Sequence, residues 1–187
     1  MQTRSDAGFS VMEMLIVLAA IAVLAGMAVP TIRNVTDGMK LGQGQRDVER
    51  EMQTARLKSV SSNRHMRLRF NCPAAGQYRM VEVVGDSTID DGSAADRCSD
   101  TKYPIVPPDD NPLTRPNNDG PIRTLPSTVA FGSAATLDFA PDGTVLYNSS
   151  GAYVPVPDPD GTAITLTKDS SVARITVNRL GKIQLVE

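Results

Sequence analysis

The feature that most constrains this chain is a long apolar run near its N-terminus. From Phe9 to Pro30 the sequence reads FSVMEMLIVLAAIAVLAGMAVP, in which Glu13 is the one charged residue. A helix needs about 20 apolar residues to cross a bilayer, so this run spans a membrane only if Glu13 lies within the span. An acidic residue at the centre of a membrane helix costs about 2.5–3.5 kcal/mol, and less near the helix end. Glu13 is therefore expected to have a function and a cationic partner.

Two simple interpretations of this N-terminus leave Glu13 without a role. A cleaved signal peptide has a basic start, an apolar core of about 7–15 residues and a cleavage site of small residues. Residues 26–28, Gly-Met-Ala, could serve as that site, but Arg4 alone makes a weak basic start. In a simple membrane anchor the acidic side chain would only oppose insertion.

A third interpretation gives Glu13 a role. The six residues GFSVME, from Gly8 to Glu13, resemble the processing motif of type IV prepilins. The resemblance implies that a prepilin peptidase cuts between Gly8 and Phe9, that the new amine of Phe9 is methylated, and that Glu13 meets the N-terminal amine of a neighbouring subunit. Pairing of this kind would offset the desolvation of both charges. Residues 1–8 would then be a cytoplasmic leader, and residues 9–30 a transmembrane assembly helix.

Residues 31–62 are expected to continue this helix. Pro30 should kink it, because proline removes one backbone hydrogen bond. Residues 36–45 contain three glycines, each of which disfavours helix by about 1 kcal/mol relative to alanine, so this segment is expected to be loosened. Beyond it an apolar stripe at helical spacing predicts a face that packs on a sheet; its members are Val48, Met52, Ala55 and Ser59, widened by Leu57 and Val60.

The remainder, residues 63–187, has the alternating pattern of a β-rich head. The expected strands are residues 65–70, 78–84, 128–131, 135–140, 144–147, 163–167, 172–177 and 182–186, with turns at 141–143 and 178–181. Residues 85–127 are rich in Asp, Pro, Ser and Gly, which predicts an irregular insertion with at most a short strand. Residues 151–161 are expected to form a loop. The predicted fold class is α+β, with the long helix packed on antiparallel sheets.

The head resembles the GspH/FimT group of minor pilins and pseudopilins. The resemblance rests on TARLKSVSSN at residues 54–63, the alternating strand after it, FAPDGTV at 139–145 and ITVNRLGKIQL at 175–185. It implies a structural subunit of a type IV pilus or a type II secretion pseudopilus, single-pass in the inner membrane with its head in the periplasm. The implied partners are other pilin or pseudopilin subunits, the prepilin peptidase, an inner-membrane assembly platform and membrane lipid.

Two cysteines, Cys72 and Cys98, make an even count. Because disulfides form outside the cytoplasm, a head in the periplasm allows them to pair. We expect a bridge between them.

DNA binding in natural transformation is the alternative function, since some FimT-like proteins are implicated in DNA uptake. Arg64, Arg67 and Arg69 are its candidate phosphate contacts, and strand alternation places Arg67 and Arg69 on the outer face of their strand. The net charge of −2, the acidic insertion and the lack of aromatic residues among these bases argue against it. DNA is therefore not the favoured partner.

The composition also argues against an enzyme. His65 is the one histidine, which excludes sites that need two, and the chain has no Ser/His/Asp set, phosphate-binding loop or CxxC pair. The aspartates of residues 86–100 do not follow the calcium-loop pattern D-x-[DN]-x-[DN]-G. We expect no catalytic residue, no metal site and no cofactor, and an exported enzyme is the least favoured hypothesis.

Overall fold

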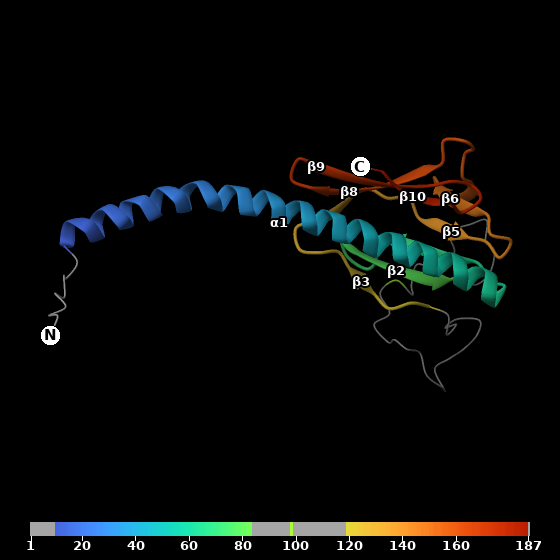
Figure 1. Ribbon diagram of the computed structural model, residues 1–187. Helices are drawn as coiled ribbons and strands as arrows, with labels where there is room; N and C mark the ends of the chain where they lie inside the picture. Colours follow the sequence, from blue (N-terminus) through green and yellow to red (C-terminus); the bar gives the residue numbers. More distant parts are fainter. Residues whose placement is uncertain (1–9, 84–97, 99–118, 187) are drawn as a thin grey trace, which may run out of the picture. The chain divides into compact units, whose positions relative to one another are not determined.

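The computed structural model describes residues 10–83, 98 and 119–186 (Figure 1). Its elements, in chain order, are α1 (Val11–Ser62), β1 (Met66–Phe70), β2 (Gln77–Glu82), β3 (Arg123–Thr124), β4 (Ala130–Ser133), β5 (Leu137–Phe139), β6 (Val145–Ser149), β7 (Ala152–Pro155), β8 (Thr162–Lys168), β9 (Ser171–Val177) and β10 (Ile183–Val186). The chain divides into two compact units, Met1–Met39 and Lys40–Glu187. We call the second unit the head. The α+β class and the antiparallel sheets are confirmed.

Helix α1 continues without interruption through the glycine-rich segment, so the predicted loosening of residues 36–45 is wrong. Gly44 shows one physical reason. A Cβ added at Gly44 would lie 3.3 Å from Cδ of Pro126 and 3.6 Å from Cδ2 of Leu125. The glycine therefore lets the helix approach the 125–129 segment closely, and tertiary packing outweighs the weak intrinsic propensity.

The N-terminal unit carries the rest of α1. No helical stretch within the described part of the chain has both the length and the apolar character needed to cross a membrane. The predicted membrane span at residues 9–30 is thus not confirmed, and the kink at Pro30 stays a prediction. Gly8 and Phe9 lie outside the described residues.

The head is organised around the buried stripe of α1. Val48, Met52, Ala55 and Ser59 are completely buried, as predicted. The prediction was wrong for Leu57 and Val60, whose side chains are 72% and 55% exposed. The buried face of the helix is therefore narrower than the apolar pattern of the sequence, and a second apolar strip lies open beside it.

Two antiparallel sheets flank this stripe. One has the order β3-β2-β1-β5-β6-β7 and the other β10-β9-β8-β4. Ser59 Oγ donates to the carbonyl of Ala140, next to β5, while Gln45 Nε2 donates to the carbonyl of Arg174 on β9 at 2.9 Å. Between these contacts lies one core, which includes Met66 and Phe139 of the first sheet and Ile164 and Ile175 of the second. Burying these side chains from both sheets against one helix is the main stabilising term of the head.

The expected turns are present. Gly143 donates to the carbonyl of Ala140 at 3.0 Å in the first turn, and Gly181 donates to the carbonyl of Asn178 at 3.0 Å in the second. Strand β7 lies within the segment 151–161 that was expected to be a loop, so that prediction is wrong for Ala152–Pro155. β7 pairs with β6 at the edge of its sheet, where its proline is tolerated.

Candidate functional site

The first turn of α1 holds the predicted assembly residue. Ser10 caps the helix: its Oγ accepts a hydrogen bond from the backbone N–H of Met12 at 3.3 Å. Glu13 follows in the exposed first turn, three residues after this cap. Ser-x-x-Glu is the spacing of a capping box, and an acidic side chain there also interacts favourably with the helix dipole. Glu13 thus has a local role available besides pairing with a neighbouring subunit.

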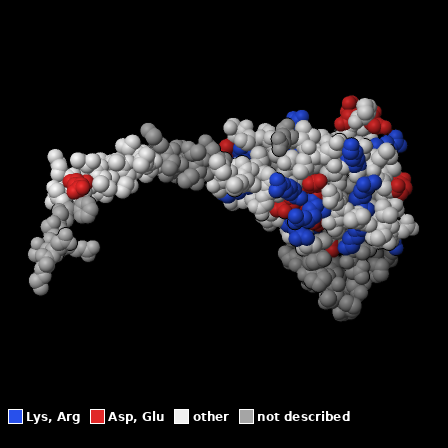
Figure 2. Space-filling model, viewed as in Figure 1, with Lys and Arg blue, Asp and Glu red and all other residues white. Residues whose placement is uncertain are grey.

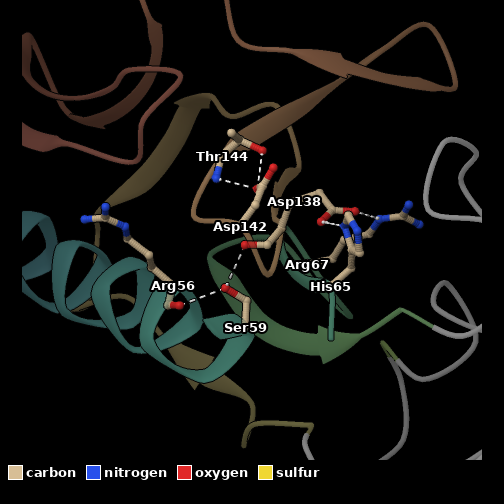
Figure 3. A network of polar contacts seen from close by, with 8 residues as sticks. Arg56, Ser59, His65, Arg67, Asp138, Asp142 and Thr144 are labelled. Atoms are coloured by element: carbon tan, nitrogen blue, oxygen red, sulfur yellow. Dashed lines mark hydrogen bonds and ion pairs between the residues drawn. The ribbon is translucent and has the colours of Figure 1, made fainter. Parts of the chain in front are cut away.

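A buried ion pair links β1 to β5 in the head. Arg67 Nε lies 3.1 Å from Asp138 Oδ2, and both side chains are completely buried. His65 Nδ1 lies 2.9 Å from the other carboxylate oxygen, and its side chain is 29% exposed. Figure 3 shows Asp138 held between these two side chains. The Arg67 guanidinium also stacks on Tyr153 of β7, 3.6 Å from the ring centroid, so the cluster ties three strands together.

The predicted DNA contacts do not form one exposed basic cluster. The alternating pattern placed Arg67 outward, but Asp138 and Tyr153 hold it inside the head. Arg69 is half-buried, and the exposed Arg64 pairs with Glu82 at 3.7 Å. Figure 2 shows Lys and Arg side chains on the face in view, with Asp and Glu side chains among them. A surface of mixed sign lacks the continuous positive potential on which phosphate binding depends.

The pairing of His65 with Asp138 resembles the orienting half of a catalytic triad. A nucleophile would have to be hydrogen-bonded to the other ring nitrogen of His65, and within the described part of the chain no hydroxyl or thiol is. Nor do the described residues include a cluster of three or more His, Cys, Asp or Glu side chains suited to a metal ion. In this geometry the carboxylate of Asp138 anchors the Arg67 guanidinium and the His65 imidazole.

A second buried polar seam joins α1 to β2 and β3. Glu51 pairs with Arg123 at 3.3 Å, and the backbone N–H of Glu82 donates to Asp119 Oδ1 at 2.7 Å. Burial raises the pKa of Glu51, an effect that the charge and the hydrogen bond of Arg123 only partly offset. Burial lowers the pKa of Lys58 on the same helix, with Asp119, Glu82 and Glu51 acting against it. The seam lies on the side of the head that carries Asp119 and β3.

Sequence reasoning missed these buried acids. The clearest signal was Asp138, which sits between Leu137 and Phe139 in an apolar strand. An acid in such a strand predicts a basic partner on a neighbouring strand. The pattern alone could not say which arginine that would be.

The two cysteines form the expected disulfide. Cys72 and Cys98 are bridged, with their Cα atoms 5.4 Å apart. Cys72 is buried at the start of the β1–β2 connection, where its N–H donates to the carbonyl of Gln77 at 3.1 Å. The bridge therefore anchors Cys98 to the first hairpin of the head.

A groove of about 730 Å³ opens between the exposed strip of α1 and the start of β10. It is lined by residues of α1 and of the β9–β10 region: Gln53, Arg56, Leu57, Val60, Ser61, Gly181, Lys182 and Ile183. This groove was not predicted from the sequence, because Leu57 and Val60 had been assigned to the buried stripe. We call this hollow the α1–β10 groove.

Comparison with known proteins identifies the head. The family model described as type II transport protein GspH matches residues 45–181. Nothing among curated proteins or solved structures matches this chain. The matched region runs from the buried part of α1 to the turn before β10, and so covers most of the head. The chain belongs to the GspH family of type II transport proteins, as the resemblance of its head segments had indicated.

Proposed function

We propose that this chain is a minor pseudopilin or pilin, a structural subunit without catalytic activity. A prepilin peptidase processes it, and it assembles with other pilin or pseudopilin subunits into the pseudopilus of a type II secretion system or into a type IV pilus. The observation that carries the proposal is the GspH match over residues 45–181. The GFSVME motif at residues 8–13 lies outside that match and supports the proposal independently.

Two features support the proposed location: the N-terminal apolar run and the disulfide of the head. Residues 1–8 are a cytoplasmic leader, and residues 9–30 insert into the inner membrane as the assembly helix. The apolar run with its one acid supports this, since an isolated acid there needs a cationic partner. The disulfide between Cys72 and Cys98 supports a periplasmic head, because disulfides persist in oxidising compartments. Membrane lipid and an inner-membrane assembly platform are the further partners.

The experiment separates the two roles available to Glu13. Gln can replace Glu in a capping box but carries no charge, so Glu13→Gln keeps the helix cap and removes the pairing with an amine. Glu13→Leu removes both, and Glu13→Asp keeps the charge. We expect the Leu and Gln variants to be processed but to enter filaments poorly, and the Asp variant to retain part of the wild-type assembly.

Two measurements decide the outcome. Intact-mass analysis should give a mature chain that begins with N-methylated Phe9; a start near Val29 would instead mean an ordinary signal peptide. Quantitation of sheared or cross-linked filaments measures assembly. Normal assembly of Glu13→Gln would show that the acid serves the helix end alone, and the proposed pairing between subunits would be wrong.

A further inference from the structure

The α1–β10 groove has an apolar floor that the head leaves open. Leu57 and Val60 lie one turn apart on α1 and are mostly exposed, and Ile183 on β10 completes the floor. The groove volume of about 730 Å³ is within the range of sites that hold a bound molecule or peptide segment. Exposed apolar side chains that line a hollow together are typical of binding surfaces.

Within the part of the chain that the structure describes, the strand beside the groove has one edge without a partner strand. β10 is the last strand in the order β10-β9-β8-β4 and pairs with β9 on one side. Its residues Gln184, Leu185 and Val186 are exposed. Such an edge offers a row of backbone donors and acceptors to which an extended segment of another chain can add as a further strand.

The rim of the groove is positively charged. Arg56 Nη2 donates to the carbonyl of Leu180 at 3.0 Å, which holds the guanidinium across the β9–β10 turn, and Lys182 follows in that turn. Among the residues that the structure describes, no carboxylate pairs with Arg56 or Lys182, whereas Arg64 and Arg123 each have an acidic partner. Both cations are thus available to acidic groups of an occupant.

These three features together define the occupant. We propose that the α1–β10 groove binds an extended segment of a partner protein in which apolar and acidic residues alternate, and that the segment adds to the edge of β10. Side chains alternate between the two faces of a sheet, and the consecutive residues Lys182 and Ile183 face opposite sides. Apolar residues of the segment then lie over Leu57 and Val60, and the intervening acids meet Lys182, with Arg56 at the end of the groove. This binding does not depend on the chain being a pseudopilin.

The test uses the full-length chain in lipid nanodiscs and two fluorescein-labelled peptides. One probe alternates valine with aspartate or glutamate over seven residues, and the other has lysine at each acidic position. Fluorescence anisotropy measures both affinities. We expect the acidic peptide to bind at least tenfold more tightly than the basic one, and the preference to weaken as salt rises.

Variants locate the binding. Arg56→Glu combined with Lys182→Glu should reverse the preference, and Leu57→Ser combined with Val60→Ser should weaken both peptides. Because Arg56 also contacts Leu180, Lys182→Glu is measured alone as well, with a several-fold loss expected for the acidic peptide. The matched control combines Val172→Ser and Arg174→Glu, two exposed positions on β9 outside the groove lining, and should change nothing.

Main-chain pairing has its own test. Two variants of the acidic peptide carry N-methyl groups on alternate backbone amides. In one variant the methylated amides lie on one edge of the peptide strand, and in the other variant they lie on the opposite edge. Strand addition to β10 predicts that one of them binds as the parent does and the other does not. Equal binding of the two would overturn strand addition, and equal binding of acidic and basic peptides would overturn the charge argument. Self-association of the chain that the Leu57→Ser/Val60→Ser variant abolishes would make a second copy the occupant, and the proposal would be wrong.

Discussion

Replacing Asp138 by asparagine tests how much the buried ion pair contributes to the head. The substitution keeps the size of the side chain and removes the negative charge that holds Arg67 and His65, at 3.1 Å and 2.9 Å. A hydrogen bond to a charged group contributes about 1.5–3 kcal/mol, and breaking one side of a buried pair costs about 3–5 kcal/mol. Since His65 is partly exposed, we expect a loss of about 3–4 kcal/mol in the free energy of unfolding.

Urea unfolding in detergent micelles measures this loss. All four tyrosines follow residue 77, so tyrosine fluorescence reports on the head and not on the apolar run. At a slope of about 2 kcal/mol per molar urea, the midpoint should fall by about 1.5–2 M. The control is Asp142→Asn, three residues after the end of β5. Asp142 is exposed, and hydrogen bonds from the hydroxyl and N–H of Thr144 lower its pKa, so its loss should stay below about 1 kcal/mol.

A double-mutant cycle decides whether the charge is responsible. Arg67→Met combined with Asp138→Asn removes both charges, and the combined loss should fall short of the sum of the single losses by about 2 kcal/mol. Additive losses, or a single loss below about 1 kcal/mol for Asp138→Asn, would refute the reasoning.

Three further predictions concern the rest of the head. Burial raises the pKa of Tyr78 to about 12, whereas a tyrosine in the unfolded chain has a pKa near 10. Between these pH values unfolding releases the Tyr78 proton, so rising pH removes about 2–3 kcal/mol from the free energy of unfolding. Urea titrations at alkaline pH should show that the Tyr78→Phe variant does not lose this stability. Gly161→Ala places a Cβ 2.7 Å from the carbonyl oxygen of Val177 at a φ of 70°, and should cost about 2–4 kcal/mol. Gly143→Ala, with a φ of 85° and no neighbour within 4 Å, should cost about 1–2 kcal/mol, and equal thermal shifts would refute the steric argument. Replacing Cys72 and Cys98 by serine opens a cross-link between residues 26 apart and should cost about 3–4 kcal/mol in urea, whereas an unchanged midpoint would mean that the bridge does not constrain the unfolded chain.

Local patterns predicted the parts of the head that depend on local physics. The stripe from Val48 to Ser59 followed from helical spacing, and the turn at Pro141–Gly143 followed from the conformations that proline and glycine favour. Leu57 and Val60 show the limit of such patterns, because a wide apolar arc on a helix does not reveal how much of the arc the sheets will cover. The sheets cover the part of the arc that holds Val48 to Ser59, and the part that holds Leu57 and Val60 lines the α1–β10 groove.

Contacts between distant segments could not be predicted from a single sequence. Arg67 was placed outward by alternation, and its partner Asp138 lies 71 residues later. Gly44 was expected to loosen the helix, but the absence of a side chain there allows Leu125 and Pro126 to approach the helix closely. Strand β7 was hidden because its proline is acceptable only at a sheet edge, and the sheet order was unknown.

The position of the α1 stripe between the two sheets has a consequence for biosynthesis. Gln45 is hydrogen-bonded to Arg174, 129 residues later in the chain, and the core partners Ile164 and Ile175 are also translated late. Pairings this distant in sequence slow folding, because the loop must close before any contact rewards it. The apolar stripe from Val48 to Ser59 therefore leaves the ribosome long before the strands that bury it have been synthesised. Until β8 and β9 arrive, that stripe is a surface on which the nascent chain can aggregate or a chaperone can bind.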